Sequence, residues 1–284
     1  MEMSSLDKME NFLSNVTLNS SKPEVCEFGS GYVAALSLID IITFLVGQPV
    51  VIRVLWSSYT SKKAIDILNC NLALYHYLQY WFAIVHLCVL HLKPNSQNTL
   101  LKFLLVYSMF GGPMSLSFIC LERYVAVIHP LFYPLLKTYR FREAAASLVW
   151  LFSVPIALLS SVVGNSLHAL RETLTRDLPL AWLLGMNGMM VHCSICILKT
   201  LVKSGPGGDK MSPQKRRAFK TVCATSVTNL MCYFPVTVLQ QYGFDEMVFE
   251  CLVTPLCILL LSAASVVHPI FYLSAQGKLF TCFK

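Results

Sequence analysis

The sequence predicts an all-α membrane protein, a seven-transmembrane helix bundle with a short amphipathic C-terminal helix. Apolar residues make up 55% of the 284 residues and charged residues only 13%, against about 25% charged residues in a soluble domain. Seven apolar runs are long enough to cross a hydrocarbon layer of ~30 Å, which takes about 20 helical residues. Short polar breaks, several of them rich in Pro and Gly, separate these runs.

The breaks set the ends of the spans in chain order. The first span is followed by the break "SSYTSKK" and the second by "KPNSQN". The third is followed by "HPLFYPLLKTYRFRE" and the fourth by "HALRETLTRD". "KSGPGGDKMSPQKRR" ends the fifth span, "GFDEM" the sixth, and "AQGKLF" follows the seventh. The predicted spans are 30–56, 64–92, 99–128, 144–166, 179–202, 216–241 and 249–273.

Three regions follow from these spans. We expect residues 1–28 to be an extracellular glycosylated tail, residues 29–273 to be the membrane domain, and residues 274–284 to be a short cytoplasmic helix and tail. The first 28 residues contain acids and no apolar core, so we expect the first span to target the chain.

The distribution of basic residues predicts an extracellular N-terminus. With that orientation, 16 of the 22 Lys and Arg residues fall on the inner side, as the positive-inside rule requires. Asn15 in "NVT" and Asn19 in "NSS" are glycosylation acceptors, and both fall on the outer side. We therefore expect a multi-pass plasma-membrane protein. Its charge of +7 reflects topology and contact with anionic lipid, not nucleic-acid binding.

Glu122 and Arg123 stand side by side where the third span ends. By themselves they are open to two interpretations, an ion pair that marks a helix end or a functional pair. Residues 122–132, "ERYVAVIHPLF", resemble the Asp/Glu-Arg-Tyr motif of rhodopsin-like G-protein-coupled receptors. Further matches follow in the order of that family: "NLAL" at 71–74, Trp150, "CYFP" at 232–235 and "HPIFY" at 268–272. Within that family, the chain most resembles the nucleotide and lipid receptors.

The resemblance implies a heterotrimeric G protein as the partner. It makes Arg123 the residue that leaves Glu122 when the sixth span swings outward, with Tyr124 and Tyr272 supporting the same interface. Lys215 occupies a position where many relatives carry an acid that clamps the arginine. The resemblance therefore also implies a weakened inactive latch.

The resemblance also identifies residues of an activation switch. Pro235 would kink the sixth span, because proline removes a backbone donor. Tyr233 replaces the tryptophan of the family, and Gly112 replaces a serine near its sodium site. The full set of switch residues is Gln48, His76, Tyr233, Pro235, His268 and Pro269.

His76 and His268 stand where the family has a sodium-binding aspartate and an asparagine. A hard cation prefers oxygen ligands, so we expect no regulatory sodium ion. Three interpretations of the histidine pair are open: neutral hydrogen-bonded side chains, a proton-linked switch, or an incomplete transition-metal site. We predict no bound metal and no cofactor.

Asp40 is a charged residue inside the first span, and such residues usually face the bundle interior and find a partner. At 1.5 Å per residue, its depth is similar to that of His86 in the second span. A pair of Asp40 with His86 is one interpretation, and a water-solvated Asp40 is the other.

The chain has 11 cysteines. The family's usual disulfide has no counterpart here, because its third-span position is Asn98. The resemblance instead allows a bond between Cys26 in the tail and Cys251 in the last external loop, as in some relatives. Cys282 is a candidate palmitoylation site.

The ligand is unknown from sequence. Leu105 stands where amine receptors have a carboxylate, which disfavours an amine. Lys102 lies one turn outward and favours a small anionic molecule or lipid, although it could instead extend to the lipid headgroups. The candidate pocket residues are Asp40, His86, Lys102, Leu105, Val106, Met109 and Gln240.

The function predicted from the sequence is a G-protein-coupled receptor for an extracellular ligand, with membrane lipid as its surroundings. The alternatives are an odorant-type receptor and a non-signalling seven-helix binding or scaffold protein. We expect no enzyme, because no nucleophile, base and orienting residue come together in the sequence.

Overall fold

A computed structural model gives the structure of the protein. It describes residues 29–60, 67–92, 97–134, 140–162, 173, 177–203, 213–242 and 248–275. The predicted tail with Asn15, Asn19 and Cys26 lies outside the described residues. So do Cys282 and nearly all of the predicted C-terminal segment.

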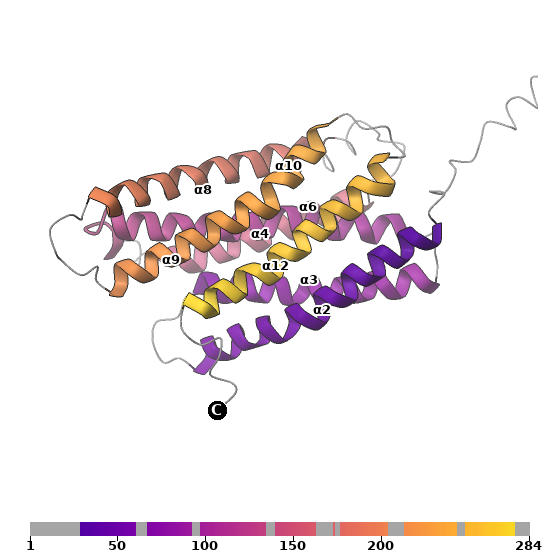
Figure 1. Ribbon diagram of the computed structural model, residues 1–284, viewed down its shortest axis with the longest axis horizontal. Coiled ribbons are helices and arrows are strands. Elements are labelled where there is room, and N and C mark those ends of the chain that lie inside the picture. The colour runs from indigo at the N-terminus through magenta and orange to yellow at the C-terminus, as the bar shows by residue number, and fades with distance from the viewer. Residues whose placement is uncertain are drawn as a thin grey trace, which may run out of the picture.

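Seven membrane-spanning helices make up the described part of the chain, as the sequence predicts. Figure 1 shows them running along the long axis of the molecule. The sixth span consists of α9, a π-helical turn and α10, and the seventh of a π-helical turn and α12. The elements are α2 (Gly29–Thr60), α3 (Ile67–Leu92), α4 (Gln97–Ile128), α6 (Phe141–Val162), α8 (Leu178–Lys203), α9 (Pro213–Thr228), α10 (Phe234–Gln241) and α12 (Thr254–Ala275).

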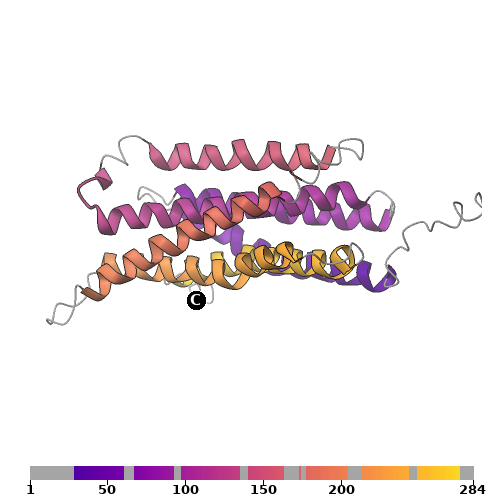
Figure 2. The ribbon, with the colours of Figure 1, turned by 90° about the horizontal axis from the view of Figure 1, so that it is seen from above.

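The central helix of the bundle is α4. In its membrane-spanning part 83% of the residues are buried, against 28 to 50% in the other six spans. It packs against α3, α6 and α8, and Figure 2 shows α6, the least buried span, at one edge of the bundle. Side chains that α4 presents at different depths can therefore contact several neighbouring helices.

Two π-helical turns stand just before prolines. The first spans Asn229–Tyr233, and the amide of Phe234 bonds to the carbonyl of Asn229, five residues back. The second spans Phe249–Val253 and precedes Pro255 in the same way. A proline ring would collide with the carbonyl four residues earlier, and a wider turn moves that carbonyl away. In the structure the sixth span therefore has a widened turn before Pro235, whereas the sequence predicts a kink there.

Buried tyrosines join α3 to α4. The Tyr75 hydroxyl donates to the carbonyl of Tyr107, and the Tyr107 hydroxyl donates to the carbonyl of Tyr75 at 3.3 Å. Their rings stack with centroids 4.0 Å apart. A β-carbon at Gly111 would overlap the Tyr75 ring, so this glycine makes room for it. Nearby, Trp150 donates to the side-chain oxygen of Asn71 at 2.7 Å.

Candidate functional site

A cluster of polar side chains surrounds Glu122 at the end of α4. Glu122 is 2% exposed, and its Oε1 accepts hydrogen bonds from Arg142 Nε at 2.8 Å and from Arg142 Nη2. Tyr133, in the segment after α4, donates to the same oxygen at 3.3 Å. The sequence offered Arg123 as the partner of Glu122, and the structure adds Arg142 from α6.

Other residues predicted for the G-protein interface lie near the same end of the bundle. Arg123 is half-buried beside Glu122. The Tyr124 ring lies 5.8 Å from His129 and 6.4 Å from His192, centroid to centroid. Tyr272 packs against a cluster of α2 and α3 side chains. Lys215 lies in the first turn of α9, and its side chain is outside the described residues.

The two core histidines lie in the middle of the bundle. His76 in α3 and His268 in α12 are 2% and 4% exposed. His76 Nδ1 lies 3.1 Å from the side-chain oxygen of Gln79. Because that oxygen can only accept, His76 donates from Nδ1. Gln48 is also buried, and its side-chain oxygen has no hydrogen-bond partner among the described residues.

Gly112 and Tyr233 fit together as a pair. A β-carbon at Gly112 would overlap the hydroxyl oxygen of Tyr233, and Tyr233 is 1% exposed. The sequence treats these as two separate departures from the family pattern. In the structure the loss of one side chain makes the space that the other fills.

Asp40 of α2 and His86 of α3 form a buried hydrogen-bonded pair. The distance from His86 Nδ1 to Asp40 Oδ2 is 2.9 Å, and both side chains are almost fully buried. This confirms the predicted pair, so Asp40 is not a water-solvated acid. A carboxylate accepts only, so His86 donates from Nδ1, and its buried Nε2 has no partner among the described residues.

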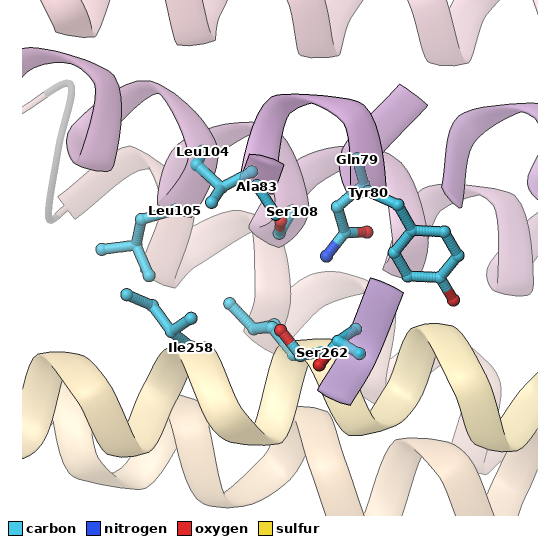
Figure 3. A pocket seen from close by; sticks show the side chains of 10 residues that line it. Gln79, Tyr80, Ala83, Leu104, Leu105, Ser108, Ile258 and Ser262 are labelled. Atoms are coloured by element: carbon cyan, nitrogen blue, oxygen red, sulfur yellow. The ribbon is translucent and has the colours of Figure 1, made fainter. Parts of the chain in front are cut away.

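A narrow pocket lies between α2, α3, α4 and α12. Figure 3 shows Gln79 and Ser108 opposite Ile258 and Ser262 of α12. The cavity volume is about 10 Å³, close to the space that one water molecule needs. None of its lining residues carries a charge. They are Thr43, Gln79, Tyr80, Ala83, Leu104, Leu105, Ser108, Ile258, Leu261 and Ser262.

The predicted ligand residues are distributed around this pocket. Leu105 lines it, and Lys102 is half-buried one turn further along α4. Val106 and Met109 are buried on other faces of α4, in apolar clusters. The side chain of Gln240 lies outside the described residues. Asp40 and His86 each lie three residues from a lining residue, Thr43 and Ala83.

Among the described cysteines, Cys251 differs from the others in its bonding. This residue is disulfide-bonded, whereas eight other described cysteines are free. Cys26 lies outside the described residues, so its bond to Cys251 stays a prediction. No group of three metal-ligating side chains occurs within the described segments, and the histidine pair by itself is too small for a structural metal site.

Several residues of these sites were not predicted from the sequence. Arg142 and Tyr133 lie in the break "HPLFYPLLKTYRFRE", and neither was assigned a role of its own. Gln79, Ser108 and Ser262 are polar residues within apolar spans. Their spacing along each helix could have placed them on inward faces, but only packing shows that they meet.

The chain is similar in sequence to known seven-transmembrane receptors. The model of a family described as "7 transmembrane receptor (rhodopsin family)" matches residues 47–176. Apelin receptor B of Danio rerio is 26% identical over 265 aligned residues, which cover 78% of this chain and 71% of the relative.

The contact between Gly112 and Tyr233 generates a stability prediction. Gly112→Ala should destabilise the protein by about 1–3 kcal/mol, the usual cost of overpacking, because the new methyl group overlaps the Tyr233 hydroxyl. Adding Tyr233→Phe should recover part of the loss. Thermal unfolding of the detergent-solubilised protein measures both effects.

Gly188→Ala is the matched control, because nothing lies within 4 Å of a β-carbon at that position. It should leave the unfolding temperature nearly unchanged. An equal loss at both glycines would mean that Tyr233 does not occupy the space beside Gly112.

The two core histidines generate a prediction about sodium. Basal signalling should be the same in sodium and in a large organic cation, because imidazoles stand where a carboxylate would bind the ion. His76→Asp combined with His268→Asn should introduce sodium sensitivity. A clear sodium response of the unaltered protein would contradict this account of the cavity.

Proposed function

Because this chain belongs to the rhodopsin family of seven-transmembrane receptors, we propose that it transmits an extracellular signal to heterotrimeric G proteins. It is a multi-pass membrane protein and a signalling receptor, not an enzyme. The observation that supports coupling best is the Glu122–Arg123 pair at the end of α4, the most buried helix. Its plasma-membrane location and extracellular N-terminus are part of the proposal and rest on the basic residues and on Asn15 and Asn19.

Coupling would take place where several helices end together. Arg123 and Tyr124 would contact the G protein directly, with Tyr272 on α12 and Lys215 on α9 at the same surface. Pro269 and Tyr272 line a second narrow space with His268. A change in the packing of His268 would therefore reach the coupling surface through its own helix.

The proposed ligand site is the pocket between α2, α3, α4 and α12. Its apolar lining, including Leu104, Leu105 and Ile258, suits the body of an amphipathic ligand. Lys102 would bind the anionic end, one turn outward. Asp40 is already occupied by a hydrogen bond from His86, with 2.9 Å between His86 Nδ1 and Asp40 Oδ2. Because the cavity volume is only about 10 Å³, room for about one water molecule, a ligand must separate the helices as it enters.

The uncharged lining of the pocket supports a second candidate. Hydroxyl groups from Thr43, Ser108 and Ser262 would suit a neutral, odorant-type ligand as well as an anionic one. A non-signalling scaffold is the third candidate. Nucleotide exchange on purified G proteins separates the scaffold from both receptor alternatives.

The first prediction concerns coupling. Arg123→Ala should abolish G-protein activation while surface expression is retained, because the variant removes only the coupling cation. Exchange of labelled nucleotide on a panel of purified G proteins, measured per receptor, gives the result. Activity equal to the unaltered receptor would rule out Arg123 as the coupling residue.

The second prediction concerns the ligand class. If single-chain anionic phospholipids activate the receptor, Lys102→Gln should raise the effective concentration about tenfold, since a charged hydrogen bond contributes about 1.5–3 kcal/mol. Zwitterionic lipids of the same chain length are the comparison. The control is His91→Gln. His91 is an exposed basic residue in the last turn of α3, the helix that precedes α4 in the chain. Unchanged potency, or a preference for zwitterionic lipids, would argue against an anionic ligand.

A further inference from the structure

The contact between Glu122 and Arg142 joins the end of α4 to the beginning of α6. The Glu122 side chain is 3% exposed and that of Arg142 is 19% exposed. Two nitrogens of one guanidinium, Nε and Nη2, donate to Glu122 Oε1. Charge-assisted contacts of this kind are about twice as strong as neutral hydrogen bonds.

Tyr133 closes the contact into a triangle. Its hydroxyl donates to Glu122 Oε1 at 3.3 Å and accepts from Arg142 Nη2 at 2.9 Å. Arg142 lies in the first turn of α6, where the amides of Glu143 and Ala144 bond to the carbonyl of Arg140. Two chain segments outside α4, the one with Tyr133 and the start of α6, therefore hold the same carboxylate.

Glu122 has one negative charge and two arginines that could use it. Arg123 is its neighbour in the chain, and Arg142 reaches it from another helix. Every contact that Glu122 makes with Arg142 compensates charge that would otherwise attract Arg123. Because the site is buried, that competition is stronger than it would be in water.

We propose that Arg142 is a positioning residue for G-protein coupling: it holds Glu122, weakens the attraction of that carboxylate for Arg123, and so leaves Arg123 available to the G protein. This inference rests on the proposed function, in which Arg123 is the coupling residue. Arg142 itself does not contact the G protein in this arrangement. Tyr133 contributes in the same direction through its bonds to both partners.

Arg142→Gln tests the proposal in purified receptor reconstituted with a G protein. Without the Arg142 charge, Glu122 should hold Arg123 more tightly, and the basal exchange rate per folded receptor should fall at least about fivefold, the lower limit of typical coupling between sites. Adding Glu122→Gln removes the competing charge and should restore the rate to at least that of the unaltered receptor. A merely structural role would lower the yield of folded receptor without changing its rate.

Arg140→Gln is the matched control. Arg140 also lies at the start of α6, but its side chain is 81% exposed and pairs with the exposed Glu143 at 3.4 Å. This change should leave the exchange rate unaltered. An unchanged or higher rate in Arg142→Gln, or a fall that Glu122→Gln does not reverse, would overturn the proposal.

Two further variants keep the outcome decisive. If Arg142→Gln does not fold, Arg142→Met is tested in its place, because methionine removes the charge and keeps an unbranched side chain. A lower rate supports the proposal, and an unchanged or higher rate overturns it. Arg123→Ala in the same assay separates the two claims: activity that survives this change defeats the proposed function itself, whereas activity lost in Arg123→Ala but unaltered in the Arg142 variant defeats only the role of Arg142.

Discussion

The need to pair buried acidic side chains inside an apolar bundle is the constraint on which the arrangement of this protein depends. A charge at the centre of a bilayer costs about 2.5–3.5 kcal/mol on insertion scales, and a buried charge without a partner costs more than a paired one. Asp40 and Glu122 are both almost fully buried. Each is held by a basic side chain of another helix: His86 in α3 for Asp40, and Arg142 in α6 for Glu122. These two contacts fix neighbouring helices near opposite ends of the bundle.

Between those ends, the helices are joined by polar contacts that use backbone carbonyls as well as side chains. Tyr75 and Tyr107 bond to each other's carbonyls, and the Tyr80 hydroxyl donates to the carbonyl of Ser265 at 3.0 Å. Glycines face several of these rings: Gly111 faces Tyr75 and Gly47 faces Tyr80. Small residues let helices approach closely in a membrane. Here they also make room for large side chains whose hydroxyl groups find partners on the next helix.

The proposed ligand pocket is connected to one of the core histidines through a single side chain. Gln79 lines the pocket, and its side-chain oxygen accepts a hydrogen bond from His76. A ligand that displaced Gln79 would therefore change the surroundings of His76 directly. The other core histidine, His268 of α12, lines the second narrow space together with Tyr272.

The sequence by itself determined the seven spans, because length and apolar composition are local properties of each segment. Those two properties decide whether a helix can cross the bilayer. It also determined the family motifs and placed Asp40 and His86 at a similar depth, since helical rise converts residue number into distance. Only the tertiary structure decided that Arg142 reaches Glu122, that Gly112 makes room for Tyr233 and that Gln79 joins the pocket to His76. Each of these contacts depends on how neighbouring helices are rotated and packed, and that rotation is set by the fit of many side chains at once rather than by the spacing within any one helix.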